Sequence, residues 1–298
     1  MKVLVSGSSG LIGTALVSAL GAAGHLPVRL VRGPPDPPGA ISWDIDANRL
    51  DPGSLTGIDA VVHLAGAGIA DHRWSDEYKR VILDSRVAGT ALLVRALTTM
   101  DAPPSVLVSG SAVGFYGDRG DEVLTEESSP GTGFLAEVAQ AWESAAAPAS
   151  AAGIRTVYLR TGLVLSATGG TLGRLVPLFR SGLGGKIGRG RQWWSWVTLD
   201  DEVRAIMHCL EAQTVGGPTN VTAPNPVTNA EFTEGLGGAL HRPTVVPVPV
   251  PAVSVVLGRE RARELVLGSQ RVIPSALERS GYVFRHRVLA DALAALFP

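Results

Sequence analysis

The chain has 298 residues, of which 45% are hydrophobic and 18% are charged, so it holds ample apolar material for a core and is not disordered in character. Its 26 basic and 27 acidic side chains give a formal net charge of -1. This balance argues against a nucleic-acid-binding or polybasic membrane-surface protein, because both need excess positive charge. The single cysteine, Cys209, excludes an intramolecular disulfide and a cysteine-rich zinc site.

The chain opens on an apolar run that reaches a glycine motif at Gly7, which leaves no room for a targeting peptide. The longest late apolar tract, residues 245–257, is broken by prolines and is shorter than the roughly 20 residues needed to cross a bilayer. We therefore expect a soluble, cytoplasmic protein with no membrane or nucleic-acid partner. The sequence is compatible with a monomer or a homodimer.

Short runs rich in β-branched residues alternate with longer runs rich in alanine and leucine through the first half. The short runs predict strands at 2–6, 28–31, 60–64, 105–109 and 156–159, and the long runs predict helices at 11–23, 76–97 and 136–151. Continuously apolar strands are typical of a sheet covered on both faces. The alternation predicts an α/β fold with a Rossmann-type doubly wound parallel sheet, and fits a set of buried helices less well.

The second half is less regular than the first. Glycines punctuate the stretch that follows residue 168, and prolines from 243 to 251 mark an extended connector. We predict a cofactor-binding Rossmann domain at residues 1–165, to which the chain returns near 197–222. Residues 166–298 are expected to form mostly a smaller substrate lobe, with a distinct terminal segment at 245–298.

A glycine-rich loop lies between the first predicted strand and the first predicted helix. It reads Gly7, Gly10, Leu11, Ile12 and Gly13 at the spacing G-x-x-G-x-x-G. Glycines permit a tight turn and close backbone approach to a pyrophosphate, and the helix N-terminus offers free N–H groups. Glycines also make ordinary turns, but the strand-loop-helix context favours dinucleotide binding.

The end of the second predicted strand indicates which dinucleotide is bound. An acidic residue there would hold the ribose 2′-hydroxyl of NAD, but the chain carries Arg32 and no carboxylate. A guanidinium can pair with a 2′-phosphate through two hydrogen bonds, so we predict NADP(H) as the cofactor. The alternative is that Arg32 is a solvated loop cation.

Several longer motifs resemble one known family. They lie at residues 7–13, 63–66, 85–90, 108–117, 159–165, 182–188 and 267–274. Together they resemble the extended short-chain dehydrogenase/reductases, and more narrowly an atypical branch of nucleoside-diphosphate-sugar epimerase-like proteins with an extra C-terminal domain of unknown function. The likeness covers nearly the whole chain.

The resemblance implies further cofactor contacts beyond the glycine loop. It implies that Leu64, Ala65 and Gly66 lie against the cofactor, that Asp44 approaches the adenine, that Arg86 contacts the cofactor and that Val164 lies near the nicotinamide. The alternative is that the aliphatic residues only fill the core and that Arg86 is a helix-surface cation. For the aliphatic residues both roles are compatible, since pocket walls are mostly apolar.

The catalytic Tyr-x-x-x-Lys pair of the wider superfamily is missing. In that pair a lysine cation lowers the tyrosine pKa, but no tyrosine of this chain has a lysine four residues later, and residues 133–139 contain neither type. Replacement candidates are Ser109 and Ser111, expected just past the fifth strand, and Tyr116, expected in the following loop. The carboxyl ends of the strands are where a doubly wound sheet binds its ligands. The alternative for all three is loop hydrogen bonding.

The segment at residues 188–196 resembles the part of sugar-nucleotide enzymes that contacts a substrate diphosphate. Arg189 and Arg191 are candidate anion ligands, and Trp193 is the candidate cleft residue, whereas Trp194 and Trp196 fit core positions. The spacings of a Walker motif, an H-E-x-x-H zinc site and a G-x-S-x-G elbow are absent from the sequence.

The leading hypothesis is an NADP(H)-dependent oxidoreductase or epimerase-like enzyme that acts on a carbonyl or secondary alcohol of a small molecule, with nucleotide-linked compounds such as nucleotide sugars among the candidate substrates. The rival hypothesis is a redox sensor or regulatory protein that binds NADP(H) without turnover, which would explain the missing pair. The identity of the small-molecule substrate is not legible in the sequence.

Overall fold

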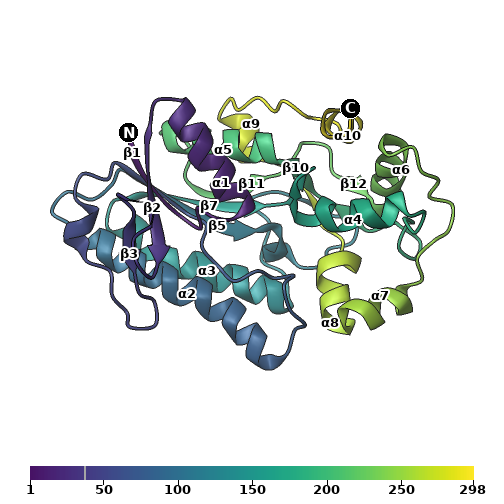
Figure 1. Ribbon diagram of the computed structural model, residues 1–298, viewed down its shortest axis with the longest axis horizontal. Helices are drawn as coiled ribbons and strands as arrows, with labels where there is room; N and C mark the ends of the chain where they lie inside the picture. Colours follow the sequence, from purple (N-terminus) through teal and green to yellow (C-terminus); the bar gives the residue numbers. More distant parts are fainter. Residues whose placement is uncertain (37) are drawn as a thin grey trace. The chain divides into compact units, whose positions relative to one another are not determined.

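The structure, a computed structural model, describes residues 1–36 and 38–298 and divides into two compact units (Figure 1). The first unit contains Met1–Ser111, Val138–Leu159 and Val203–Thr219. The second contains Ala112–Glu137, Arg160–Glu202 and Asn220–Pro298. Residues 112–137 and 160–165, predicted to belong to the Rossmann domain, belong to the second unit.

A seven-stranded sheet forms the centre of the first unit. Its strands are β1 (Lys2–Ser6), β2 (Leu26–Arg32), β3 (Ile41–Trp43), β4 (Ala60–His63), β5 (Val106–Ala112), β7 (Arg155–Thr161) and β11 (Gly217–Val221), in the order β11-β7-β5-β4-β1-β2-β3. The pairs from β3 to β5 are parallel. The order reverses between β1 and β4, which confirms the predicted doubly wound Rossmann-type fold. Strand β3 escaped prediction because it has three residues and no apolar run.

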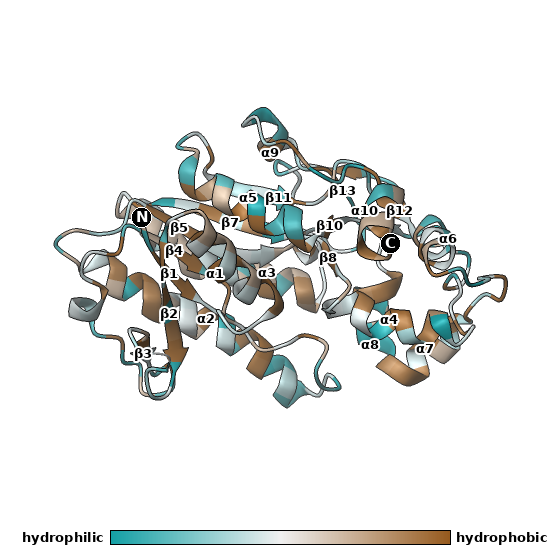
Figure 2. Ribbon diagram, turned by 45° about the horizontal axis from the view of Figure 1, so that its top comes forward, coloured by the Kyte–Doolittle hydropathy of each residue, from teal (hydrophilic) through white to brown (hydrophobic). Residues whose placement is uncertain are grey.

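Four helices cover the two faces of this sheet. They are α1 (Leu11–Ala22), α2 (Asp76–Thr98), α3 (Phe134–Ala151) and α5 (Leu199–Glu211), and η1 (Pro52–Leu55) is a short 3-10 turn. Figure 1 shows α2 and α3 on one face and α1 and α5 on the other. The main core lies under α2 and α3, where Leu93, Leu97 and Ala146 pack with Leu4 and Val61 of the sheet. Strands β1 and β4, which carry Leu4 and Val61, are coloured mostly as hydrophobic in Figure 2, as a sheet covered on both faces requires.

The second unit is built from short elements. They are η2 (Val113–Tyr116), β6 (Val123–Leu124), β8 (Leu163–Ser166), α4 (Gly170–Arg180), β9 (Trp193–Trp194), β10 (Trp196–Thr198), β12 (Val227–Thr228), α6 (Asn229–Ala239), α7 (Val250–Leu257), α8 (Arg259–Ala262), η3 (Arg263–Leu267), β13 (Arg271–Val272), α9 (Ser275–Arg279) and α10 (Leu289–Leu296). The strands pair as β10-β8, β12-β9 and β13-β6. Its core joins Trp196 and Phe179 to Phe232 of α6 and Leu293 of α10. The C-terminal helix is therefore part of this unit's core.

The part of the chain that the structure describes contains no helix that is both long and apolar enough to cross a membrane. Across residues 1–36 and 38–298, three or more histidine, cysteine or acidic side chains never gather in an arrangement that would hold a metal ion.

Candidate cofactor and catalytic site

The glycine loop is held in a shape that only glycine permits at two of its positions. Gly7 has φ of 66°, and a Cβ there would lie 2.8 Å from the Leu64 carbonyl carbon. A Cβ on Gly13 would lie 2.2 Å from the Gly7 carbonyl oxygen. Both positions would clash with backbone that cannot move aside, so the motif is a steric requirement of this loop.

The N-terminus of α1 is left open toward a ligand. Gly10 is its N-cap residue, no side chain caps the helix, and its first turn holds no acidic residue. Leu11 and Ile12 are the first two helical residues, and the N–H groups of a first turn lack intrahelical partners. The open end of a 12-residue helix therefore offers donors and a favourable dipole to a phosphate.

A buried hydrogen-bond chain fixes the backbone that follows β4. The Ser6 hydroxyl accepts the N–H groups of Leu64 at 3.1 Å and Ala65 at 3.3 Å, and lies 2.6 Å from His63 Nδ1. Because its single proton must then go to Nδ1, His63 carries its own proton on Nε2, which lies 2.9 Å from Thr90 Oγ1. Burial lowers the pKa of His63 to about 4, so the imidazole is neutral and this tautomer persists at physiological pH.

Arg86 and Ser85 hold the next part of the same segment. Ser85 Oγ accepts the Ala67 N–H at 3.0 Å, and Arg86 Nη1 donates to the Ala67 carbonyl at 3.0 Å. A Cβ on Gly66 would lie 3.1 Å from the Arg86 guanidinium carbon, which shows how closely the two pack. Arg86 is 7% exposed, and burial lowers its pKa to about 10, so it remains a cation at neutral pH. It is a buried cation and not the helix-surface cation of the alternative reading.

Arg86 also lies over an aromatic ring. Its guanidinium carbon is 5.0 Å from the centroid of the Trp142 ring on α3. A cation over the indole face is stabilised by the ring quadrupole, which partly offsets its desolvation. Residues 64–67 are therefore held by β1 and α2, which gives a ligand lying along them a rigid wall.

Arg32 lies at the last position of β2 and is exposed. Arg29, on the same strand, was not singled out from the sequence, yet its Nη1 donates to the Ser8 carbonyl in the glycine loop at 3.4 Å. Asp44 is hydrogen-bonded to nearby residues of its own loop. Its carboxylate accepts hydrogen bonds from the Ala47 N–H at 2.9 Å and from the Arg49 guanidinium at 3.1 Å. These two hydrogen bonds lower the pKa of Asp44, in that order of importance.

The serine candidates lie within β5 and not beyond it. Ser109 is fully buried, and its hydroxyl contacts the Gly110 carbonyl at 3.5 Å. Ser111 is 6% exposed, and its Oγ donates to Glu143 Oε1 on α3 at 2.7 Å. The expected position past the strand is wrong because β5 continues to Ala112. Ser111, unlike Ser109, has a carboxylate partner.

Tyr116 also differs from its expected place in a loop. It ends the 3-10 turn η2 and is fully buried, where its hydroxyl donates to Asn220 Oδ1 at 2.7 Å and accepts from Arg160 Nη1 at 3.0 Å. Burial raises the pKa of Tyr116, and the Arg160 cation opposes that rise. The Arg160 guanidinium also lies 3.4 Å from the Phe115 ring centroid. These contacts occupy the hydroxyl within the second unit, so its catalytic role stays a prediction without geometric support.

The predicted substrate residues lie in the second unit. Arg189 and Arg191 are exposed. Val164, which the resemblance implies to lie near the nicotinamide, is a partly buried residue of β8 in the same unit. The indole N–H of Trp193 donates to Asp121 at 2.9 Å, and the Arg271 guanidinium covers its ring at 4.3 Å. The Trp193 ring is thus already bounded by two charged groups.

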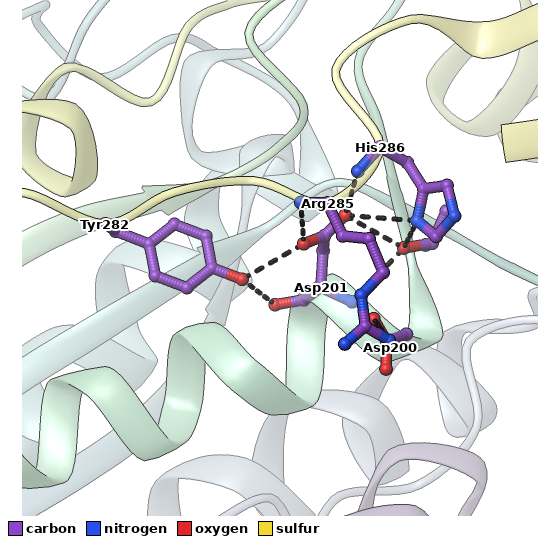
Figure 3. Close-up of polar contacts among 6 residues, drawn as sticks. Asp200, Asp201, Tyr282, Arg285 and His286 are labelled. Carbon is purple, nitrogen blue, oxygen red and sulfur yellow. Dashed lines mark hydrogen bonds and ion pairs between the residues drawn. The ribbon is translucent and has the colours of Figure 1, made fainter. Parts of the chain in front are cut away.

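Asp201 anchors the C-terminal region to the start of α5 (Figure 3). Its side chain is fully buried and accepts the backbone N–H groups of Arg285 at 2.8 Å and His286 at 2.9 Å. The Tyr282 hydroxyl donates to the Asp201 carbonyl at 2.9 Å, and His286 Nδ1 lies 3.4 Å from its carboxylate. The preceding residue, Asp200, instead forms an exposed ion pair with Arg285 at 3.0 Å.

Comparison with known proteins assigns the chain to a family. Residues 3–222 match the NAD dependent epimerase/dehydratase family, and residues 248–296 match a domain of unknown function, DUF1731. The chain belongs to the NAD dependent epimerase/dehydratase family. This confirms the resemblance seen in its motifs, including the additional C-terminal domain.

Relatives of this epimerase-family chain are similar over nearly its whole length. Epimerase family protein Mb2239 of Mycobacterium bovis is 47% identical over 291 residues, which are 98% of this chain and 96% of that protein. The crystal structure of human epimerase family protein SDR39U1 (isoform2) with NADPH is 36% identical, covers 99% of each chain and has a TM-score of 0.91. The nucleoside-diphosphate sugar epimerase from Corynebacterium glutamicum is 39% identical with a TM-score of 0.82, and the match spans 58% of that chain.

Sequence reasoning missed the residues that act at a distance along the chain. Ser6 and Arg29 carry no motif of their own, and Ser85 lies in the motif at residues 85–90 but was given no role, although each contacts the glycine loop or residues 64–67. Glu143 is 32 residues from Ser111, so only the packing of α3 on β5 brings them together. The local signal that could have suggested Arg29 is its position on the same strand as Arg32.

Proposed function

We propose that this chain is an NADP(H)-dependent oxidoreductase or epimerase that acts on a carbonyl or secondary alcohol group of a small molecule. The observation that carries the proposal is the glycine loop, in which Gly7 packs against the Leu64 and Ala65 backbone and Gly13 against the Gly7 and Ser8 backbone, next to the uncapped N-terminus of α1. Neither position has room for a Cβ, and the free N–H groups of the helix start are suited to a pyrophosphate. When bound, the cofactor would supply hydride transfer, and the chain would supply positioning and proton transfer.

The preference for NADP(H) rests on the cations at the end of β2. Arg32 is exposed there, Arg29 reaches the glycine loop, and no carboxylate stands at the end of the strand to repel a 2′-phosphate. The NADPH in the crystal structure of the human relative supports the same cofactor for this chain. Arg86 and Ser85 would hold the backbone wall along the cofactor and would not need to touch it.

Titration of NADPH and NADH by nicotinamide fluorescence tests the cofactor assignment. We expect Arg32→Ala to weaken NADPH affinity about tenfold or more, the loss typical of a charged hydrogen bond, and Arg32→Asp to reverse the preference toward NADH. Arg80→Ala, which removes an exposed arginine of α2, is the matched control. Unchanged NADPH affinity in Arg32→Ala would refute the role of Arg32.

A second candidate function is an NADP(H) sensor that does not turn over. The absence of the Tyr-x-x-x-Lys pair favours it, because no phenol with a lysine partner is present to move a proton. A panel of quinones, aldehydes and sugar nucleotides, followed at the nicotinamide absorbance, separates the two functions. Tight NADPH binding without turnover of any compound would favour the sensor.

A further inference from the structure

A short hydrogen bond joins the end of β5 to the middle of α3. Ser111 Oγ donates to Glu143 Oε1 at 2.7 Å, and both residues belong to the first unit, as do the glycine loop and residues 64–67. We propose that Glu143 is the proton acceptor of the reaction and that it acts through the Ser111 hydroxyl, in place of the missing tyrosine and lysine. The proposal rests on the proposed oxidoreductase function.

The direction of this hydrogen bond prepares Ser111 to accept a proton. A serine hydroxyl has one proton and two acceptor sites, and an ionised carboxylate can only accept. Because the Ser111 proton points to Glu143, the remaining lone pairs of Oγ are available to the hydroxyl of a secondary alcohol. Ser111 would then be the catalytic residue that touches substrate, and Glu143 the residue that acts through it.

Packing between β5 and α3 makes the pair possible. A Cβ on Gly110 would lie 2.6 Å from the Trp142 ring, so only glycine lets α3 approach the strand at this point. Trp142 immediately precedes Glu143, and this approach brings the carboxylate to Ser111. Glu143 lies one helical turn beyond residues 133–139, the stretch that lacks the superfamily's phenol and ammonium.

The surroundings of Glu143 do not offer a competing phenolate. Tyr158 of β7 lies near it, and burial raises the pKa of Tyr158, with a further rise from the Glu143 charge. Tyr158 is therefore protonated at neutral pH and does not replace the missing catalytic tyrosine. The Arg86 cation lies over the neighbouring Trp142 ring. The partly exposed Glu143 keeps access to solvent, where a proton can be released after each turnover.

The proton and hydride balance in each direction. In oxidation, the carbinol carbon loses a hydride to the oxidised nicotinamide of NADP⁺, the substrate hydroxyl proton passes to Ser111 Oγ, and the Ser111 proton passes to Glu143. The products are a ketone, NADPH and a protonated Glu143, which returns its proton to solvent. Reduction runs through the same transfers in reverse, with protonated Glu143 as the source of the proton.

Equilibrium binding tests the carboxylate without a substrate. If Ser111 contacts the reacting oxygen, Glu143 lies two hydrogen bonds, or about 5 Å, from that oxygen and roughly 8 Å from the nicotinamide ring that takes the hydride. At that distance its charge still favours the cationic NADP⁺ over NADPH. We expect Glu143→Gln to lower the affinity for NADP⁺ relative to NADPH about tenfold. Glu143→Asp keeps the charge and should keep most of the ratio. Asp84→Asn, which removes an exposed carboxylate of α2, is the matched control and should leave the ratio unchanged.

Turnover measurements, combined with the affinity ratio, distinguish the role of the Ser111 hydroxyl from that of the Glu143 charge. With any compound of the quinone, aldehyde and sugar-nucleotide panel that the full-length chain converts, we expect Ser111→Ala and Glu143→Gln each to lower kcat about 100-fold or more, with little change in KM for NADPH. Ser111→Ala should keep the ratio of NADP⁺ to NADPH affinity, because it leaves the carboxylate in place.

The outcomes distinguish this proposal from the proposed function. An affinity ratio that stays within about twofold in Glu143→Gln, in a chain that still binds NADPH, overturns the role of Glu143 and leaves the cofactor assignment standing. Wild-type kcat in both variants overturns the proton path. Failure of the wild-type chain to bind NADPH or NADP⁺ refutes the proposed function, and this proposal with it.

Discussion

Glu202, in the first turn of α5, is a buried carboxyl that we expect to make stability depend on pH. It is fully buried, its Oε1 accepts the Thr161 hydroxyl at 2.9 Å, and its Oε2 has no hydrogen-bond partner among the described residues. Burial raises the pKa of Glu202 from 4.5 to about 8, and the Thr161 hydrogen bond opposes this only in part. The folded protein therefore holds a proton there at neutral pH, whereas the unfolded chain has released it.

The sign and size of the effect follow from proton linkage. Between pH 4.5 and 8 the folded state binds the proton and the unfolded state does not, so the free energy of unfolding falls as pH rises through this window. A difference of three to four pKa units corresponds to about 5 kcal/mol at most. The full stability is present below pH 4.5, and the loss is complete above about pH 8.

Glu202→Gln isolates this contribution because glutamine is neutral at every pH and can still accept from Thr161. Its amide leaves a buried donor without a partner, which costs about 1–3 kcal/mol, but this cost does not vary with pH. We therefore expect the free energy of unfolding of the variant, relative to wild type, to rise by about 3–5 kcal/mol between pH 5 and pH 8.5.

Urea unfolding followed by far-UV circular dichroism at both pH values measures the difference. Glu234→Gln, which removes an exposed carboxylate of α6, is the matched control and should show no such change. A difference between Glu202→Gln and wild type that is the same at pH 5 and pH 8.5 would refute the reasoning, since it would mean that the carboxyl is already ionised in the folded state.

Three further substitutions test the backbone around the site and the C-terminal anchor. Gly13→Ala places a Cβ 2.2 Å from a carbonyl oxygen, so NADPH affinity should fall at least about tenfold, whereas Gly21→Ala, where a Cβ meets open space in the same helix, should retain affinity and stabilise the helix by about 0.5–1 kcal/mol. Ser6→Ala removes the hydroxyl partner of the Ala65 N–H and of the His63 imidazole, whereas the Leu64 N–H keeps the Ser6 carbonyl at 3.4 Å, so the free energy of unfolding should fall by about 1–3 kcal/mol; an unchanged urea midpoint would contradict the hydrogen-bond chain. Asp201→Asn should cost about 2–3 kcal/mol and make the C-terminal region more susceptible to limited proteolysis, and equal cleavage rates would argue against the anchor.

The sequence predicted the parts of the site that depend on neighbouring residues. The glycine loop is legible because a strand, a turn and a helix start follow one another within 12 residues, and their steric demands fall on the same short stretch. The doubly wound sheet could be predicted because its inner strands β1, β4 and β5 contain continuous apolar runs, whereas the short edge strand β3 has none. The position of Arg32 at the end of β2 could be predicted because the apolar run indicates where that strand ends.

The parts that depend on tertiary packing could not be read in the same way. The partners Ser111 and Glu143 are 32 residues apart, and nothing local marks Glu143 as different from other helix carboxylates. Tyr116 is a catalytic candidate in the sequence because it is expected in a loop. In the structure its hydroxyl is hydrogen-bonded to Asn220, and no local pattern could indicate a partner 104 residues away. The sequence tells which residues carry a hydroxyl or a carboxyl group. It does not tell which hydrogen-bond partners these groups have, because the fold brings those partners from distant parts of the chain.

The C-terminal domain of unknown function contributes to the second unit in ways that an appended module would not. Its Glu264 carboxylate accepts the N–H groups of Phe134 at 2.9 Å and Leu135 at 2.7 Å, so it caps the start of α3 from 130 residues away. Its strand β13 pairs with β6, and its helix α10 supplies Leu293 to the core. Since α3 also carries Glu143, the domain stabilises the helix on which the proposed proton acceptor depends. Residues 248–296 are therefore an integral part of the second unit, and they cap the helix on which the proposed proton acceptor lies.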